Sequence, residues 1–123
     1  MAFRTVVEVV IGVFYALGAG YQSLWVLRHS EEFYRDMADG SWLPPAQAFI
    51  EKVLVPNSVA VTALVAVFEA GAAIALLTRG AAVVPALIAG GIFTIVGALT
   101  SRPGESVFFV ALAALHFWLA AAH

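Results

Sequence analysis

Apolar residues fill four long stretches of the chain, and the polar residues gather in the segments between them. The stretches cover residues 5–27, 58–78, 81–100 and 106–122. A helix needs roughly 20 apolar residues to cross the hydrocarbon core of a membrane, and each stretch comes close to that length. The pattern therefore predicts four membrane-spanning helices, which together form a single domain over residues 1–123.

Tight turns are expected at 78–80 and at 101–104, where the sequence carries Arg, Gly and Pro between apolar stretches. Gly80 is the expected terminator of the second helix, and Ser58 and Ser106 are placed to cap the helices that follow the loops. Short connections make consecutive helices antiparallel neighbours. We therefore expect an all-α fold, an up-down four-helix bundle in the membrane.

The connection over 29–57 is the long one, and it has helical features of its own. Ser30 and two acidic residues are typical of a helix start, and Gly40 is typical of a helix end. A second short helix is expected after Pro44, with its apolar residues on one side. Both segments are predicted to lie at the membrane interface, with Trp42 at headgroup depth. The alternative is an ordinary solvated loop.

The composition agrees with lipid as the main surroundings of the chain. Residues are 63% hydrophobic and 11% charged, whereas about 25% of a soluble domain is charged. The net charge of −2 is too small to indicate a partner, and the sequence has no basic stripe that would favour nucleic-acid binding. The chain has no cysteine, which excludes disulfides, thiolate metal sites, iron–sulfur clusters and thiol redox chemistry.

Basic residues favour one orientation in the membrane. The face with the long connection carries four of them, Arg28, Arg35, Lys52 and Arg102. The opposite face carries two, Arg4 and Arg79. Because cytoplasmic loops carry an excess of Lys and Arg, the count favours a cytoplasmic long connection.

Glu69 stands near the middle of the second apolar stretch, ~16 Å from its start. A carboxylate at this depth is costly in lipid, so it is a functional-site hypothesis. Tyr15 and His116 are expected at similar depth, with Gln22 and Thr94 about two turns nearer the long connection. Such a cluster can bind the carbonyl or hydroxyl group of a quinone, or relay protons. The alternative is a buried polar contact that fixes the register of the helices.

Other features have a structural interpretation. Glu8 and Arg79 belong to the same membrane face and are expected to pair there. His116 and His123 lie ~10 Å apart along one helix and cannot sandwich one haem iron. No His and carboxylate cluster has metal-ligand spacing, so no metal site is predicted. Small residues spaced by four, such as Gly12 and Ala16, favour helix packing within the chain or a homodimer seam.

The segment 68–79, a glutamate followed by a Gly/Ala-rich apolar run and a Thr-Arg turn, resembles the DoxX family of small four-helix bacterial membrane proteins. Residues 43–45 resemble the Leu-Pro-x-Pro element that this family places before its second helix, and 18–21 also fit. The pattern extends from about Gly12 to Thr94. At residue level it carries over only to Glu69 and Arg79.

The resemblance implies a protein of the bacterial inner (cytoplasmic) membrane that acts beside a redox enzyme. The name-giving relatives are subunits of a thiosulfate:quinone oxidoreductase. The implied function is an accessory, non-catalytic subunit of a quinone-linked oxidoreductase, with a bound quinone and no cofactor of its own. Its implied partners are membrane lipid and a redox-enzyme subunit. The alternatives are a membrane scaffold without a ligand, and a protein that binds or transports a small lipophilic molecule.

Overall fold

The computed structural model describes residues 2–123, and the regular structure in this range is helical throughout. Within that range the four long helices are α1 (Phe3–Leu24), α4 (Ser58–Thr78), α5 (Val83–Thr100) and α6 (Pro103–Ala121). Each of these is long and apolar enough to cross a membrane. The predicted fold class, an all-α fold with four helices of membrane-spanning length, is confirmed.

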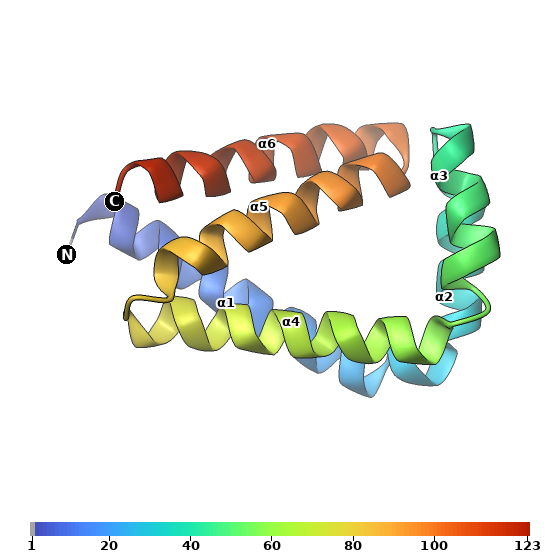
Figure 1. The fold of residues 1–123 in the computed structure, drawn as a ribbon, viewed down its shortest axis with the longest axis horizontal. Coiled ribbons are helices and arrows are strands. Elements are labelled where there is room, and N and C mark those ends of the chain that lie inside the picture. The colour runs from blue at the N-terminus through green and yellow to red at the C-terminus, as the bar shows by residue number, and fades with distance from the viewer. Residues whose placement is uncertain (1) are drawn as a thin grey trace.

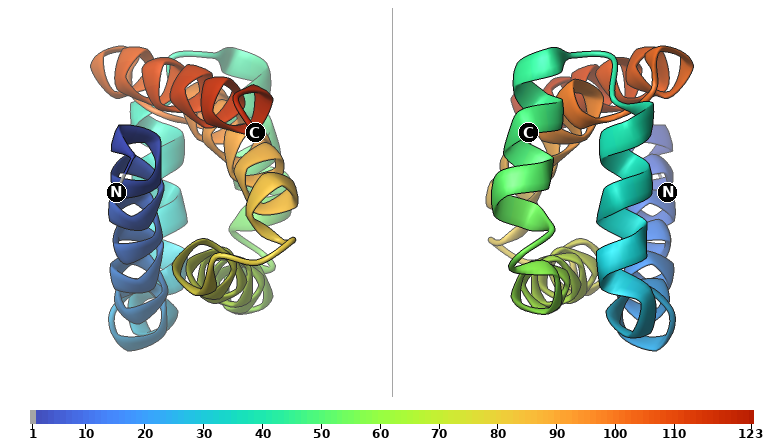
Figure 2. Two further views of the ribbon diagram at one scale, coloured as in Figure 1. Left: turned by 90° about the vertical axis from the view of Figure 1, so that its left-hand side faces the viewer. Right: turned by 90° about the vertical axis from the view of Figure 1, so that its right-hand side faces the viewer.

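The four long helices are arranged as two closely packed pairs. Helix α1 packs along α4, and α5 packs along α6, whereas α4 and α5 contact each other much less. Figure 1 shows that the pairs approach each other near the two chain termini and separate toward the other end. Viewed end-on, the helices surround a central region (Figure 2). The site described below occupies this region.

The wide end of the bundle is covered by short helices that run across it (Figure 1). They are α2 (Ser30–Gly40) and α3 (Pro44–Phe49), and α3 continues into the π-helical turn η2 (Ile50–Leu54). A 3₁₀ turn, η1 (Val26–His29), leads from α1 into α2. The two short helices predicted for the long connection are therefore present.

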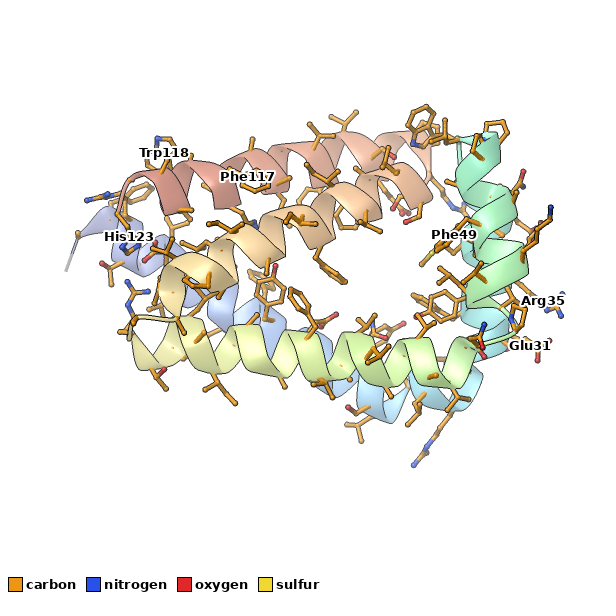
Figure 3. The ribbon with its side chains drawn as sticks, in the orientation of Figure 1. Glu31, Arg35, Phe49, Phe117, Trp118 and His123 are labelled. Atoms are coloured by element: carbon orange, nitrogen blue, oxygen red, sulfur yellow. The ribbon has the colours of Figure 1, made fainter. Side chains whose placement is uncertain are left out.

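These short helices have one polar and one apolar side. Glu31 and Arg35 form an ion pair with a distance of 2.6 Å on the outer side of this end (Figure 3). Phe49 lies on the side that faces the long helices (Figure 3). Tyr34 and Ile50 are buried in a small hydrophobic cluster between the short helices and the bundle. The amphipathic pattern in the sequence thus corresponds to real inner and outer faces.

The bounds of three long helices differ from the predicted spans. Helix α1 ends at Leu24 rather than at residue 27, and the His29 ring stacks on Trp25 with ring centroids 4.2 Å apart. Helix α5 starts at Val83 rather than at 81, after a turn over residues 80–82. Helix α6 starts at Pro103 rather than at 106, because proline suits the first turn of a helix. Helix α4 covers the predicted residues 58–78.

The serines expected to cap helices bind other groups instead, so that part of the prediction is wrong. The Ser30 hydroxyl donates to the Ser58 hydroxyl at 2.9 Å and joins α2 to α4. The Ser106 hydroxyl donates to the Ala98 carbonyl at 2.6 Å and joins α6 to α5. Inside a bundle, a hydroxyl can satisfy its hydrogen bond by bridging two helices, which competes with capping.

Arg79, and not Gly80, is the residue that ends α4 in the left-handed conformation, with φ 59° and ψ 41°. The predicted role of Gly80 is therefore wrong. The left-handed conformation destabilises a residue with a β-carbon by roughly 1–2 kcal/mol. The contacts of the Arg79 side chain, described below, offset this cost.

Candidate functional site

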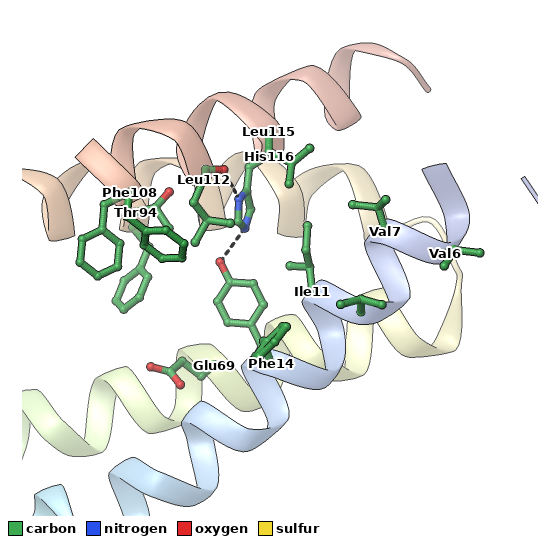
Figure 4. Close-up of a pocket in the computed structure, with 14 residues that line it drawn as sticks. Val6, Val7, Ile11, Phe14, Glu69, Thr94, Phe108, Leu112, Leu115 and His116 are labelled. Atoms are coloured by element: carbon green, nitrogen blue, oxygen red, sulfur yellow. Dashed lines mark hydrogen bonds between the residues drawn. The ribbon is translucent and has the colours of Figure 1, made fainter. Parts of the chain in front are cut away.

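A cavity of about 500 Å³, called the outer cavity below, lies between the α1/α4 pair and the α5/α6 pair. Its wall is formed mainly by apolar side chains of α1 and α6, and Figure 4 shows the residues around it. Four of the predicted ligand-binding residues line it, Tyr15, Glu69, Thr94 and His116. The cavity thus brings together polar residues from all four long helices.

A second cavity, of about 390 Å³ and called the inner cavity below, lies beneath α2 and η2 at the wide end of the bundle. Gln22, the fifth predicted residue, lines this cavity. The lining residues common to the inner and outer cavities are Glu69, Phe93, Thr94 and Phe109. Glu69 therefore lies at the junction of these cavities.

Glu69 is buried and has no hydrogen-bond or ion-pair partner among the described residues. Glu69 is only 7% exposed. None of the side-chain hydrogen bonds or ion pairs found between residues 2 and 123 involves it. Its carboxylate approaches α1 at Gly18, where a β-carbon would overlap Oε2. The glycine makes room for the carboxylate at the junction of the cavities.

Tyr15 and His116 form a hydrogen bond that crosses the bundle from α1 to α6. The Tyr15 hydroxyl lies 2.8 Å from Nε2 of His116, and Nδ1 of His116 lies 2.7 Å from the Leu112 carbonyl oxygen (Figure 4). Because a carbonyl only accepts, Nδ1 carries the proton of a neutral ring and Nε2 accepts from Tyr15. A β-carbon at Gly90 of α5 would come within 2.9 Å of His116 Nε2, so this glycine allows the close approach.

Thr94 and Gln22 differ in how their polar groups are satisfied. The Thr94 hydroxyl donates to the carbonyls of Gly90 and Gly91, each at 2.9 Å. Oε1 of Gln22, in contrast, is buried and has no hydrogen-bond partner among the described residues. An unsatisfied buried acceptor costs free energy, so it is a place where a ligand donor is favoured.

A separate ionic cluster lies at the end of the bundle that carries the termini. Glu8 is 1% exposed and lies 2.6 Å from Arg79 and 2.6 Å from Nε2 of His123. Arg79 also donates to the Leu76 carbonyl at 3.3 Å, and Arg4 donates to the Ala122 carbonyl. The structure thus contains the expected Glu8–Arg79 pair. It fastens the start of α1 to the ends of α4 and α6.

Sequence reasoning missed residues that shape the site. His123 was not expected in the ionic cluster, although its ring lies 2.6 Å from the Glu8 carboxylate. Tyr34 is 4% exposed and lines the inner cavity, and burial raises the pKa of its phenol above the ordinary value of 10. The feature of the sequence that could have indicated the position of Tyr34 is its hydroxyl on the apolar face of a short helix. Gly18 and Gly90 give no such signal, because any glycine in an apolar helix looks alike.

No group of three His, Cys, Asp or Glu side chains within residues 2–123 is placed to hold a metal ion. In comparisons with known proteins, no family model, curated protein or solved structure matches this chain. The resemblance to the DoxX family therefore stays a prediction from the sequence, and the function is inferred below from the geometry of the cavities.

Proposed function

We propose that this protein binds a small lipophilic molecule inside the membrane, with the head group of the ligand at Glu69. The observation that carries the proposal is the position of this carboxylate, which has no partner within residues 2–123 and lies at the junction of the inner and outer cavities. Ionisable residues inside a membrane are costly, and they commonly mark sites for ligands, ions or protons. A polar head group would satisfy the carboxylate that the described residues leave without a partner.

The outer cavity suits the apolar tail of such a molecule. Its rim includes Phe14 on α1 and Phe108 on α6, which are 64% and 62% exposed on the outside of the bundle. In a membrane, this rim faces the acyl chains, so a ligand can enter sideways from the lipid. An apolar cavity with a few polar groups is the usual form of a site for small molecules.

A molecule of the quinone pool, in its oxidised or its reduced form, fits this division into a polar and an apolar part. In the reduced form the ring carries hydroxyl groups that can donate to the Glu69 carboxylate, and the tail is apolar in both forms. In agreement with the DoxX resemblance, we assign the protein the role of an accessory membrane subunit that brings the quinone pool to a partner oxidoreductase. The chain itself has no cysteine for electron transfer, so electrons would pass through the partner.

We place the protein in the bacterial inner membrane with the segment 29–57 on the cytoplasmic side. The location follows the family resemblance, and the orientation follows the basic residues. Arg28, Arg35, Lys52 and Arg102 belong to the end that carries α2 and α3. The positive-inside rule assigns this end to the cytoplasm.

Native mass spectrometry of the protein in mild detergent, followed by organic extraction, tests the binding proposal. Wild type should carry a lipophilic molecule in stoichiometric amount, and Glu69→Gln should carry much less, because its amide alters the polar contact without changing the size of the residue. Glu51→Gln is the matched control, since Glu51 is exposed on η2. Bulk lipid alone in all three proteins would contradict ligand binding and favour the scaffold hypothesis.

A further inference from the structure

We infer that the inner cavity binds a head group that donates hydrogen bonds, and thus a membrane-soluble phenol or hydroquinone in preference to a quinone. This inference rests on the proposed function and adds the chemical class of the ligand. It follows from the polar atoms around the inner cavity, which mainly accept hydrogen bonds.

Gln22 supplies the first of these acceptors. Its Oε1 is buried without a partner, and the residue lines the inner cavity. Gln22 follows Gly18 by one helical turn, which places it about 6 Å further along α1 from the point where Glu69 contacts this helix. The residues that carry these two acceptors, Glu69 and Gln22, therefore line the same cavity.

The hydroxyl groups on α5 use their protons elsewhere. Thr94 donates to the Gly90 and Gly91 carbonyls, and Thr100 donates to the Val96 carbonyl at 2.9 Å. Each hydroxyl has a single proton. Toward the inner cavity, which both threonines line, their oxygens can therefore only accept.

The phenol of Tyr34 is a hydroxyl in the wall of the inner cavity that can both donate and accept. It can donate to a ligand oxygen while that oxygen donates to Glu69 or Gln22. A hydroxyl ligand, which also donates and accepts, can satisfy this arrangement. A quinone carbonyl can only accept, and it would leave Oε1 of Gln22 without a donor.

Aromatic rings in the wall favour an aromatic head group. Phe33 of α2, Phe49 of α3, Phe93 of α5 and Phe109 of α6 line the inner cavity. The rings of Phe68 and Phe93 already pack with centroids 4.9 Å apart. A planar ring bearing a hydroxyl can pack on these side chains and direct its donor toward Glu69 or Gln22.

A matched ligand pair tests the inference without any redox step. We would measure binding of para-decylphenol and its methyl ether to the protein in lipid nanodiscs, by thermal stabilisation and by native mass spectrometry. The ether has the same apolar tail and lacks the donor. We expect the phenol to bind at least about tenfold more tightly, and a hydroquinone to bind more tightly than the quinone with the same tail.

A variant then assigns the preference to a residue. Gln22→Leu should reduce the ratio between phenol and ether several-fold, while Ser23→Ala, which removes an exposed hydroxyl on the same helix, should leave the ratio unchanged. The comparison of ligands in wild type does not depend on the folding of any variant. Equal binding of phenol and ether would overturn the inference and leave the proposed function standing. Binding of neither, nor of the quinone and hydroquinone, would overturn both.

Discussion

The carboxylate of Glu69 on α4 lies so close to Gly18 on α1 that a β-carbon at position 18 would overlap Oε2. This contact places an acidic group between the cavities while α1 and α4 stay packed along each other. It also connects the helix packing to the proposed binding site. The site therefore depends on a residue that has no side chain.

Gly18→Ala should move the Glu69 side chain and weaken ligand binding. The carboxylate is the flexible end of a side chain, so we expect the fold to persist with a loss of about 1 kcal/mol in the free energy of unfolding. In a Glu69→Ala background the same change should have little effect, because the overlapping atoms are gone. Reversible unfolding in mixed micelles of the four proteins in this double-mutant cycle measures the coupling.

Gly71→Ala is the control for this cycle. A β-carbon at Gly71 meets no atom within 4 Å. Alanine has a higher helix propensity than glycine, so this substitution should be neutral or stabilise the protein by up to about 1 kcal/mol. An equal loss of stability in Gly18→Ala and Gly71→Ala would show that the contact with Glu69 has no special effect.

Tyr15→Phe should destabilise the bundle by about 1 kcal/mol. It removes the donor to His116 Nε2, which lies 2.8 Å from the Tyr15 hydroxyl, and leaves that buried nitrogen without a partner. Tyr21→Phe is the matched control, because Tyr21 is an exposed tyrosine on the same helix. The two variants are compared by unfolding in mixed micelles. Equal stabilities would mean that the α1–α6 hydrogen bond contributes nothing.

Arg79 combines an ion pair with a left-handed backbone, and two substitutions separate these effects. Arg79→Ala should cost at least about 2 kcal/mol, because it removes one partner of the buried Glu8 carboxylate. Arg79→Gly loses the same ion pair and accepts φ 59° without strain. It should therefore be about 1 kcal/mol more stable than Arg79→Ala. The reverse order of unfolding free energies would contradict the strained conformation.

Tyr34 should make the protein less stable in alkali. Because burial raises the pKa of its phenol in the folded state, the folded protein keeps the proton while an unfolded chain loses it above about pH 10. The contribution of Tyr34 is thus complete below this pH and is lost as the pH rises through the folded-state pKa. The unfolding temperature, measured against pH, should fall less steeply above about pH 10 in Tyr34→Phe than in wild type.

The exposed Tyr21 again supplies the comparison. Tyr21→Phe should keep the wild-type dependence of the unfolding temperature on pH, since the Tyr21 side chain stays exposed when the protein folds. If Tyr34→Phe and Tyr21→Phe gave the same profile as wild type, the burial of Tyr34 would have no effect on stability.

The sequence was sufficient for the features that depend on hydropathy and its period. Helices α2 and α4 have the predicted bounds, and the amphipathic pattern identified the inner face of the short helices. The cluster at Glu69 was proposed because a carboxylate in an apolar run is costly, which requires no coordinates. The pairing of Glu8 with Arg79 followed from their common membrane face.

The features that the sequence did not reveal depend on contacts between distant segments. Ser58 was expected to cap its helix, but its hydroxyl accepts from Ser30, which is brought close by the fold. Gly80 was expected to end α4 because glycine is a common helix terminator, whereas Arg79 ends it in the left-handed conformation and pairs with Glu8 of α1. The cavities themselves arise because the two helix pairs separate toward one end of the bundle. No local pattern in the sequence predicts this separation.

Photoaffinity labelling tests the central claim, a ligand with its head at Glu69 and its tail in the outer cavity, most directly. The probe is a short-chain benzoquinone with a diazirine at the end of its tail, applied in its oxidised and its reduced form to the protein in nanodiscs. We predict labels on residues of the outer cavity such as Val10, Phe14 and Phe108, and loss of these labels in Glu69→Gln. Labels spread equally over lipid-facing residues such as Leu64 and Val67 of α4, unchanged in Glu69→Gln, would contradict the account.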